Sequence, residues 1–250
     1  MERTRNFVIS LASAWFLRLL ERTKVVRLKI FKNRQQAGQL LANEVVRQGY
    51  KDPVVLGLPR GGVPIAAEVA AKLKAPLDII LVRKIGAPMQ AELAIGAVVD
   101  GDAPEIVRNE RLIRELGISE DEFIEDAQRQ LEIIEARRKL WVAGRPRIPV
   151  KDKTAIIVDD GIATGATVRA SLKALKRQGP KRTVVATPVA PLQAVEDLQQ
   201  EADDVICLET PGYFGAIGFF YRDFSQVSDA EVSRLLEGMR AEGIPKEGGG

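Results

Sequence analysis

Two adjacent acids, Asp159 and Asp160, stand between an apolar run and a segment rich in glycine and hydroxyl groups, in the stretch "AIIVDDGIATGAT". The segment Thr164–Thr167 can surround a phosphate with main-chain N–H groups, two hydroxyls and the N-terminus of a following helix. The carboxylates repel phosphate, so they suit neutral hydroxyls, from which they accept hydrogen bonds, or Mg²⁺ held through water. A ribose 5-phosphate offers all of these partners. The stretch therefore predicts a sugar-phosphate site rather than a simple helix cap.

Two other loops carry residues suited to anions. The loop after the run "VVLGL" contains Arg60, Gly61 and Gly62. Its glycines let the main chain approach a ligand closely, and Arg60 offers a planar fork to a phosphate. Arg83 and Lys84 follow a second apolar run, "LDIILV", where adjacent cations suit a polyanion. Each pattern taken alone also fits a plain turn with a surface arginine, or a solvated basic pair.

The composition excludes several kinds of chemistry. The 250-residue chain has no histidine and one cysteine, Cys207. Catalysis by Ser-His-Asp or Cys-His groups, histidine-bound zinc and an intramolecular disulfide are therefore excluded. Cys207 lies in an apolar stretch, which favours a core position over a nucleophile. The formal net charge is +3 and both signs are mixed along the chain, so there is no dedicated nucleic-acid tail.

Short apolar runs alternate with helical periodicities along the chain. Helices are predicted at 34–50, with Gly49 as its stop, from 63 with Pro64 in the first turn, and at 166–179, 192–202 and 227–240. Buried strands are predicted at 53–58, 77–82, 154–160, 182–189 and 204–209, and a further strand, part of a hairpin, at 92–99. This order predicts an α/β fold with a mostly parallel sheet, whose ligands bind beyond the carboxyl ends of the strands.

The segment 109–145 has a different character, long, charged and helical. Ser119 and Glu122 form a capping box, and apolar residues recur on one face of the helix that follows. These residues are Phe123, Ala127, Leu131, Ile134 and Trp141. The pattern favours a packing or dimerisation element over a mobile lid.

The two ends of the chain are set apart from this pattern. Residues 1–30 contain the run "FVISLASAWFLRLL", which Arg18 interrupts and which is shorter than a membrane span of roughly 20 residues. A peripheral helix or a non-native extension is favoured over an export signal, and we expect a cytoplasmic protein without a membrane partner. Residues 241–250 are expected to form a flexible tail.

The longest motif gives the chain a family resemblance. "IIVDDGIATGAT" resembles the phosphoribosyl pyrophosphate (PRPP) binding motif of the type I phosphoribosyltransferases. The segments "LPRGGVP", "ELAIGAV" and "YRDFSQVSD" are similar to a little-characterised bacterial branch of that superfamily. The resemblance covers residues 34–240. It implies a domain over 31–240 with a central, mostly parallel sheet flanked by helices, a small hood at 211–224 and a helical insertion at 109–145.

The resemblance also implies roles for the site residues. Asp159 and Asp160 would hold the ribose 2- and 3-hydroxyls. The 5-phosphate would be held by Ala163, Thr164, Gly165, Ala166 and Thr167, and the pyrophosphate by Arg60, Gly61 and Gly62. Arg83 and Lys84 would be catalytic, because they would stabilise the charge that grows on the leaving pyrophosphate. Mg²⁺ would be carried by PRPP, without a direct protein ligand, and could reach Asp159 or Asp160 through water.

The implied reaction transfers a 5-phosphoribosyl group to a nitrogenous, nucleobase-like acceptor through an oxocarbenium-like transition state. Ala163 stands where relatives that use 6-oxopurines commonly carry aspartate, which speaks against hypoxanthine and guanine. The aromatic hood is the candidate for acceptor binding, through Phe219, Tyr221 and Asp223. It also fits a patch that covers the sheet edge or a dimer contact, and Asp223 also fits a cap on the next segment.

Two other functions stay open beside the transferase. One is a PRPP-sensing regulator that binds RNA or DNA with little turnover, for which the basic residues from Arg137 to Arg147 would be the footprint. The other is a hydrolase of a phosphorylated ribose compound. The expected partners are PRPP and the acceptor, and the chain is expected to form a homo-oligomer, most simply a dimer.

Overall fold

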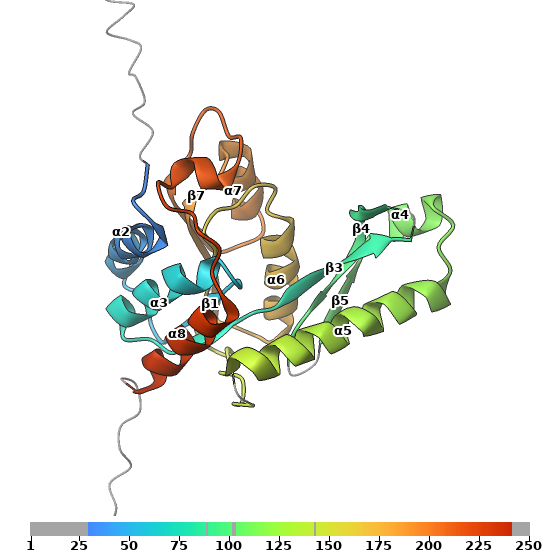
Figure 1. The fold of residues 1–250 in the computed structure, drawn as a ribbon, viewed down its shortest axis with the longest axis horizontal. Coiled ribbons are helices and arrows are strands. Elements are labelled where there is room, and N and C mark those ends of the chain that lie inside the picture. The colour runs from blue at the N-terminus through green and yellow to red at the C-terminus, as the bar shows by residue number, and fades with distance from the viewer. Residues whose placement is uncertain (1–29, 89, 102–103, 143, 242–250) are drawn as a thin grey trace, which may run out of the picture.

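The computed structural model describes residues 30–88, 90–101, 104–142 and 144–241. The expectations for the N-terminal extension up to residue 29 and for the tail from residue 242 lie outside the described residues. The described chain forms a main α/β body from which an arm projects, on the right in Figure 1. No helix in these ranges has both the length and the apolar character needed to cross a membrane.

A five-stranded parallel sheet forms the centre of the body, in the order β2-β1-β6-β7-β8. Its strands are β1 (Pro53–Gly57), β2 (Leu77–Ile79), β6 (Thr154–Val158), β7 (Arg182–Val189) and β8 (Asp204–Glu209). The chain moves to one side of β1 to form β2 and to the other side to form β6, so the strand order reverses between β1 and β6. In this register Gly57 pairs with Val158, and the two strands end level with each other. Loops that follow these two strands therefore emerge side by side, where ligands of open α/β sheets bind.

Side chains of the sheet alternate between two buried layers. Val55 and Ile156 pack into the core on one face, whereas Val54 and Ile157 pack into the core on the other. Helices α2 (Arg34–Arg47) and α3 (Gly62–Leu73) cover the first face, and α6 (Ala166–Arg177) and α7 (Leu192–Gln199) cover the second. Because both faces are covered, the strands are continuous apolar runs, as parallel strands require.

The arm consists of a three-stranded antiparallel sheet and two helices. The strands β3 (Val82–Ala87), β4 (Gln90–Val99) and β5 (Glu105–Arg108) lead into α4 (Glu110–Glu115) and α5 (Glu120–Val142). Helix α5 runs along the arm and returns to the body, where it packs on α8 (Asp229–Ala241). The capping box is confirmed, since Ser119 N and Oγ both donate to Glu122 Oε2, at 3.0 and 2.7 Å.

One expected strand is divided in the structure. The apolar run at 77–82 leaves the parallel sheet after Ile79 and continues as β3, which pairs with β4 in an antiparallel hairpin. Asp100 fixes the point at which the chain leaves the parallel sheet. Its carboxylate accepts a hydrogen bond from Leu81 N at 2.7 Å, and its own N–H donates to Leu81 O at 2.9 Å. Arg83 and Lys84 therefore lie in a strand, which corrects the prediction that they stand in a loop.

Candidate functional site

The loops that follow β1 and β6 are in direct contact. Leu58 N donates to Val158 O at 2.9 Å. A Cβ placed on Gly61 would stand 2.0 Å from Asp160 Oδ2, and one on Gly62 would stand 2.5 Å from Val158 O. Real Cβ atoms do not approach so closely, so both positions need glycine. The structure thus joins the Arg60–Gly62 loop to the acid pair, two segments that the resemblance assigned to the same ligand.

A cavity of about 190 Å³ lies beside this junction. Pro59 and Asp159 line it from the two loops, Thr167 lines it from the first turn of α6, and Arg83 lines it from β3. Helix α5 closes another side with Ile134, Arg137 and Trp141. Typical ligand pockets measure roughly 300–1,000 Å³, so a ligand with several phosphates would extend beyond this space.

The two acids point to different surroundings. Asp159 is half-buried and lines the cavity, and its Oδ1 accepts from Asp160 N at 2.8 Å. Asp160 is buried, and its Oδ2 accepts from Arg34 Nε at 2.8 Å. Burial, together with the charge of Asp160, raises the pKa of Asp159 well above its ordinary value. Burial also raises the pKa of Asp160, against the opposing effect of Arg34.

Arg34 is a site residue that the sequence did not single out. Its guanidinium lies 3.9 Å from the ring centre of Phe224, and its Nη1 donates to Ser225 O at 2.7 Å. It therefore ties the start of α2 and the segment after the hood to Asp160, which is 126 positions further along the chain. Nothing near Arg34 in the sequence signals this contact, since it begins an ordinary amphipathic helix.

The predicted phosphate loop leads directly into α6. Ala163, Thr164 and Ala166 are exposed, and Thr167 is half-buried at the cavity. Gly165 precedes the helix with φ +73°, a left-handed conformation that favours glycine. The first N–H groups of a helix have no partners within it, so this exposed turn offers donors and a positive dipole end to an anion.

The predicted basic residues divide between two places. Arg83 lines the cavity, and its Nε donates to Gln130 Oε1 on α5 at 2.7 Å. Lys84 is exposed and is not among the residues that line the cavity, because successive side chains of a strand point to opposite faces. Arg60 stands outside the cavity lining, with its Nη1 3.5 Å from Asp229 Oδ1.

The hood residues predicted to bind the acceptor lie elsewhere. Phe219, in the 3₁₀ helix Ile217–Phe220, is 70% exposed. Tyr221 is buried and donates from its hydroxyl to Asp160 O at 2.6 Å, so it supports the acid loop. Asp223 accepts from Ser225 N at 3.1 Å, which is the capping role that the sequence also allowed. None of the three is among the residues that line the cavity.

Asp159 is the carboxylate of the acid pair that lines the cavity, whereas Asp160 is buried and paired with Arg34. In the described part of the chain, no group of three or more histidine, cysteine, aspartate or glutamate side chains could hold a metal ion. Mg²⁺ is commonly bound through one or two carboxylates, waters and substrate phosphates rather than by an all-protein cage. Asp159 therefore fits a Mg²⁺ ion that arrives with a phosphorylated ligand.

Comparison with known proteins decides the family. Residues 27–221 match the family described as "Phosphoribosyl transferase domain". The chain belongs to this family. The fold of this phosphoribosyl transferase domain is the type I phosphoribosyltransferase fold that the resemblance implied, with a parallel sheet flanked by helices and a small antiparallel sheet.

Two relatives share most of this phosphoribosyl transferase chain. "Putative phosphoribosyl transferase Rv0571c" of Mycobacterium tuberculosis strain H37Rv is 44% identical over 212 residues, which are 84% of this chain and 47% of that protein. The chain thus spans about half the length of that relative. The crystal structure of TT1426 from Thermus thermophilus is 42% identical, with a TM-score of 0.72, and the match covers 83% of this chain and 97% of that one.

Proposed function

We propose that this phosphoribosyl transferase domain binds PRPP with Mg²⁺, transfers the 5-phosphoribosyl group to a nitrogenous acceptor and releases pyrophosphate. The observation that carries the proposal is the shared cavity. The stretch with Asp159 and Thr167, the strand with Arg83 and the loop that begins at Pro59 are three separate parts of the sequence, and all three line one space. They supply acceptors for ribose hydroxyls, donors for a phosphate, and a cation for a leaving group.

The protein's own groups account for the steps that the reaction needs. The carboxylates of Asp159 and Asp160 accept hydrogen bonds from the ribose hydroxyls and fix the sugar ring, and the start of α6 holds the 5-phosphate. The bond from C1 to the pyrophosphate oxygen breaks, a bond from C1 to the acceptor nitrogen forms, and that nitrogen loses a proton to the departing pyrophosphate or to water. Arg83 neutralises the charge that develops on the leaving group, and the apolar wall of Ile134 and Trp141 limits the access of water.

The role of Mg²⁺ follows from the charge of the ligand. When bound, it neutralises part of the negative charge on the diphosphate. Burial holds the pKa of Asp159 high, and a nearby cation favours the charged carboxylate. The acid pair is therefore suited to become fully charged in the presence of a metal-bound ligand.

A double substitution, Asp159→Asn with Asp160→Asn, tests the proposal. The amides cannot accept as charged groups, so PRPP affinity measured by calorimetry in the presence of Mg²⁺ should fall by at least about a hundredfold. Asp121→Asn, on the exposed first turn of α5, is the matched control and should bind PRPP like the wild type. Circular dichroism and the melting temperature show whether the double variant keeps its fold. Unchanged affinity in a folded double variant would contradict the assignment.

The acceptor is found by measuring pyrophosphate release from PRPP with a panel of nucleobases and small amines. Release that depends on one acceptor supports the transferase. Release that needs no acceptor supports a hydrolase, and PRPP-responsive, salt-sensitive retention on RNA without turnover supports a regulator.

A further inference from the structure

Helix α5 turns one continuous face toward the cavity. Gln130, Ile134, Arg137 and Trp141 follow each other at spacings of four, three and four residues, which places them on one side of an α-helix. Gln130 Oε1 accepts a hydrogen bond from Arg83 Nε, and the other three residues line the cavity directly. The insertion that the sequence assigned to packing or dimerisation therefore forms a wall of the site.

Arg137 brings a second positive charge to this space. Other arginines of α5 are paired with acids: Arg129 contacts Glu125 and Asp126, and Arg138 contacts two aspartates. Among the ion pairs of the described residues, none includes Arg137, whose guanidinium lies 5.9 Å from the ring centre of Trp141. Burial and the charge of Arg137 lower the pKa of Arg83, so the two guanidinium groups repel each other in the absence of an anion.

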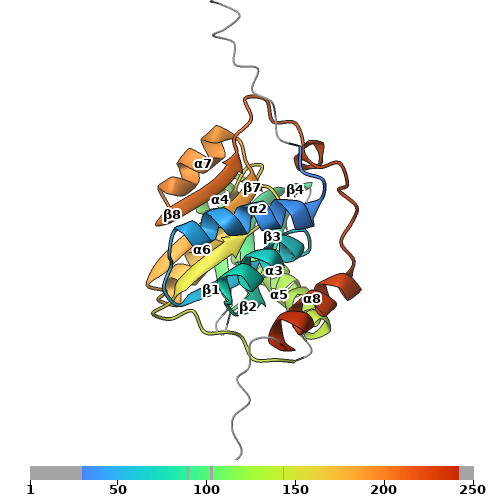
Figure 2. The ribbon, with the colours of Figure 1, turned by 90° about the vertical axis from the view of Figure 1, so that its left-hand side faces the viewer.

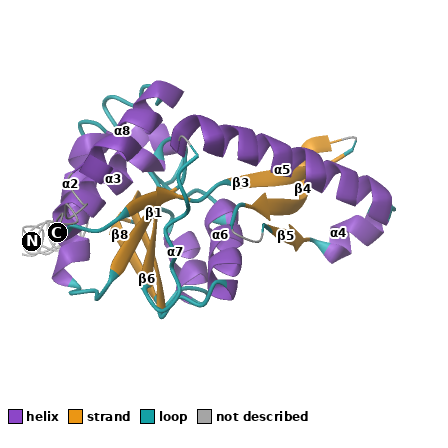
Figure 3. Cartoon of the chain, turned by 90° about the horizontal axis from the view of Figure 1, so that it is seen from below, coloured by secondary structure: helices purple, strands orange, loops and turns teal. Residues whose placement is uncertain are grey.

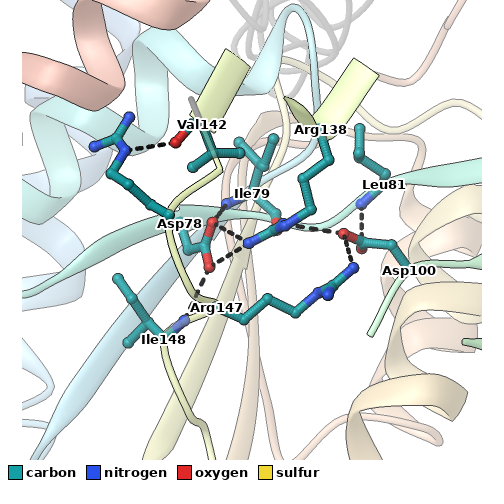
Figure 4. Close-up of polar contacts among 9 residues, drawn as sticks. Asp78, Ile79, Leu81, Asp100, Arg138, Val142, Arg147 and Ile148 are labelled. Atoms are coloured by element: carbon teal, nitrogen blue, oxygen red, sulfur yellow. Dashed lines mark hydrogen bonds and ion pairs between the residues drawn. The ribbon is translucent and has the colours of Figure 1, made fainter. Parts of the chain in front are cut away.

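A buried ionic cluster holds this part of α5 in place. Arg138, the next residue, points into the protein, where its Nη2 lies 2.9 Å from Asp78 Oδ2 and its Nη1 lies 3.0 Å from Asp100 Oδ2 (Figure 4). Asp78 also accepts from Ile148 N at 3.0 Å, and Arg147 approaches Asp100 at 3.4 Å. The cluster joins α5 to the point where β2 ends and β3 begins, which is also where Arg83 enters the cavity.

We propose that Arg137 binds, together with Arg83, the diphosphate end of the ligand in this cavity, and that the cluster around Arg138 positions α5 for this contact. The inference rests on the proposed function and adds a binding residue to the site. Two guanidinium forks on separate elements match an anion with two phosphoryl groups, one for each fork. Asp159 lines the same cavity, and an anion is favoured beside the arginines rather than beside this carboxylate.

Binding of inorganic pyrophosphate, measured by calorimetry with Mg²⁺, tests the role of Arg137 independently of turnover. In Arg137→Gln we expect the affinity to fall about tenfold to a hundredfold, since hydrogen bonds to a charged group are lost. The affinity should also become less sensitive to salt. Arg137→Lys should recover part of the affinity, because it keeps the charge but not the fork. Lys139→Gln is the matched control, because it removes one positive charge from an exposed position two residues further along α5, outside the cavity lining.

The outcomes separate this inference from the proposed function. Wild-type affinity in Arg137→Gln, or an equal loss in Lys139→Gln, overturns the role of Arg137 and leaves the transferase proposal intact. A wild-type protein that binds pyrophosphate but not PRPP contradicts the proposed function, and the variants then still decide the role of Arg137. A wild-type protein that binds neither overturns both proposals.

Discussion

The substitution Arg138→Met removes the central cation of the buried cluster while keeping a long side chain in its place. Arg138 makes four polar contacts, two to Asp78, one to Asp100 and one to Ile79 O. Loss of one partner from a buried ion pair costs about 3–5 kcal/mol, because the other charge stays buried. In the variant, Asp78 and Asp100 still accept hydrogen bonds from the main-chain N–H groups of Ile79, Leu81 and Ile148. We therefore expect the lower end of this range, a loss of about 3 kcal/mol, which corresponds to a fall in the melting temperature of about 6–12 °C.

The cost of this substitution should depend on pH. Burial raises the pKa of Asp100 above its ordinary value, and Arg138 opposes that rise. The folded protein therefore binds a proton more readily at Asp100 than the unfolded chain, and stability falls as pH rises between the unfolded and the folded pKa. Without Arg138, the pKa of Asp100 in the folded protein rises further. The pH range over which stability falls therefore extends to higher pH. The loss of stability should be smallest in acid, where Asp100 is protonated, and should grow toward neutral and alkaline pH.

Urea unfolding and thermal melting of the wild type and the variant at several pH values between 5 and 9 measure this dependence. Arg129→Met is the control, because Arg129 pairs with acids on the exposed surface of the same helix and its loss should leave the midpoint nearly unchanged at every pH. A loss in Arg138→Met that is the same at all pH values would refute the reasoning on Asp100. A loss no greater than that of the control would refute the importance of the cluster itself.

Two further predictions concern other positions. Gly61→Ala places a methyl group 2.0 Å from Asp160 Oδ2, so the loop or the acid must move. We expect the variant to lose about 1–3 kcal/mol of stability and to bind PRPP at least about tenfold more weakly. Wild-type values in thermal melting and calorimetry would show that the two loops are not in contact. Cys207 is partly buried, and desolvation raises its pKa to about 11. Its alkylation by iodoacetamide at pH 8 should therefore be about a hundredfold slower than that of an unperturbed thiol and should accelerate up to pH 10. A rate typical of a free thiol at pH 8 would contradict the raised pKa.

The contact between the loops after β1 and β6 could be predicted from the sequence because both loops follow short apolar runs. Runs of that kind form neighbouring parallel strands whose carboxyl ends share one edge of the sheet. The family resemblance assigned both loops to one ligand, and the structure brings Asp159 and the glycine loop together. The roles of these residues in ligand binding stay predictions.

The arm could not be predicted in the same way. The run at 77–82 has no signal that ends the strand after Ile79, since the interaction that turns it away comes from Asp100, about twenty positions later. Arg34 was missed, and Arg137 was considered only as part of a nucleic-acid footprint, for a related reason. Each lies on a helix whose periodicity shows which side is apolar, but not which distant element its polar side chain meets. Tyr221 was expected to face a ligand, whereas its hydroxyl serves the main chain of the acid loop.

Helix α5 is a single uninterrupted span of 23 residues. Near its start, Phe123 packs closely against Gly96 of β4, and near its end Ile134, Arg137 and Trp141 line the cavity. One residue added or removed between these regions would rotate everything beyond it by about 100°, since a helical turn takes 3.6 residues. Seven added residues would restore the face but lengthen the helix by about 10 Å, since each residue rises 1.5 Å along the axis. A length change within α5 therefore breaks the contact at one of its two ends, whereas the loop between α4 and α5 is free of that restriction.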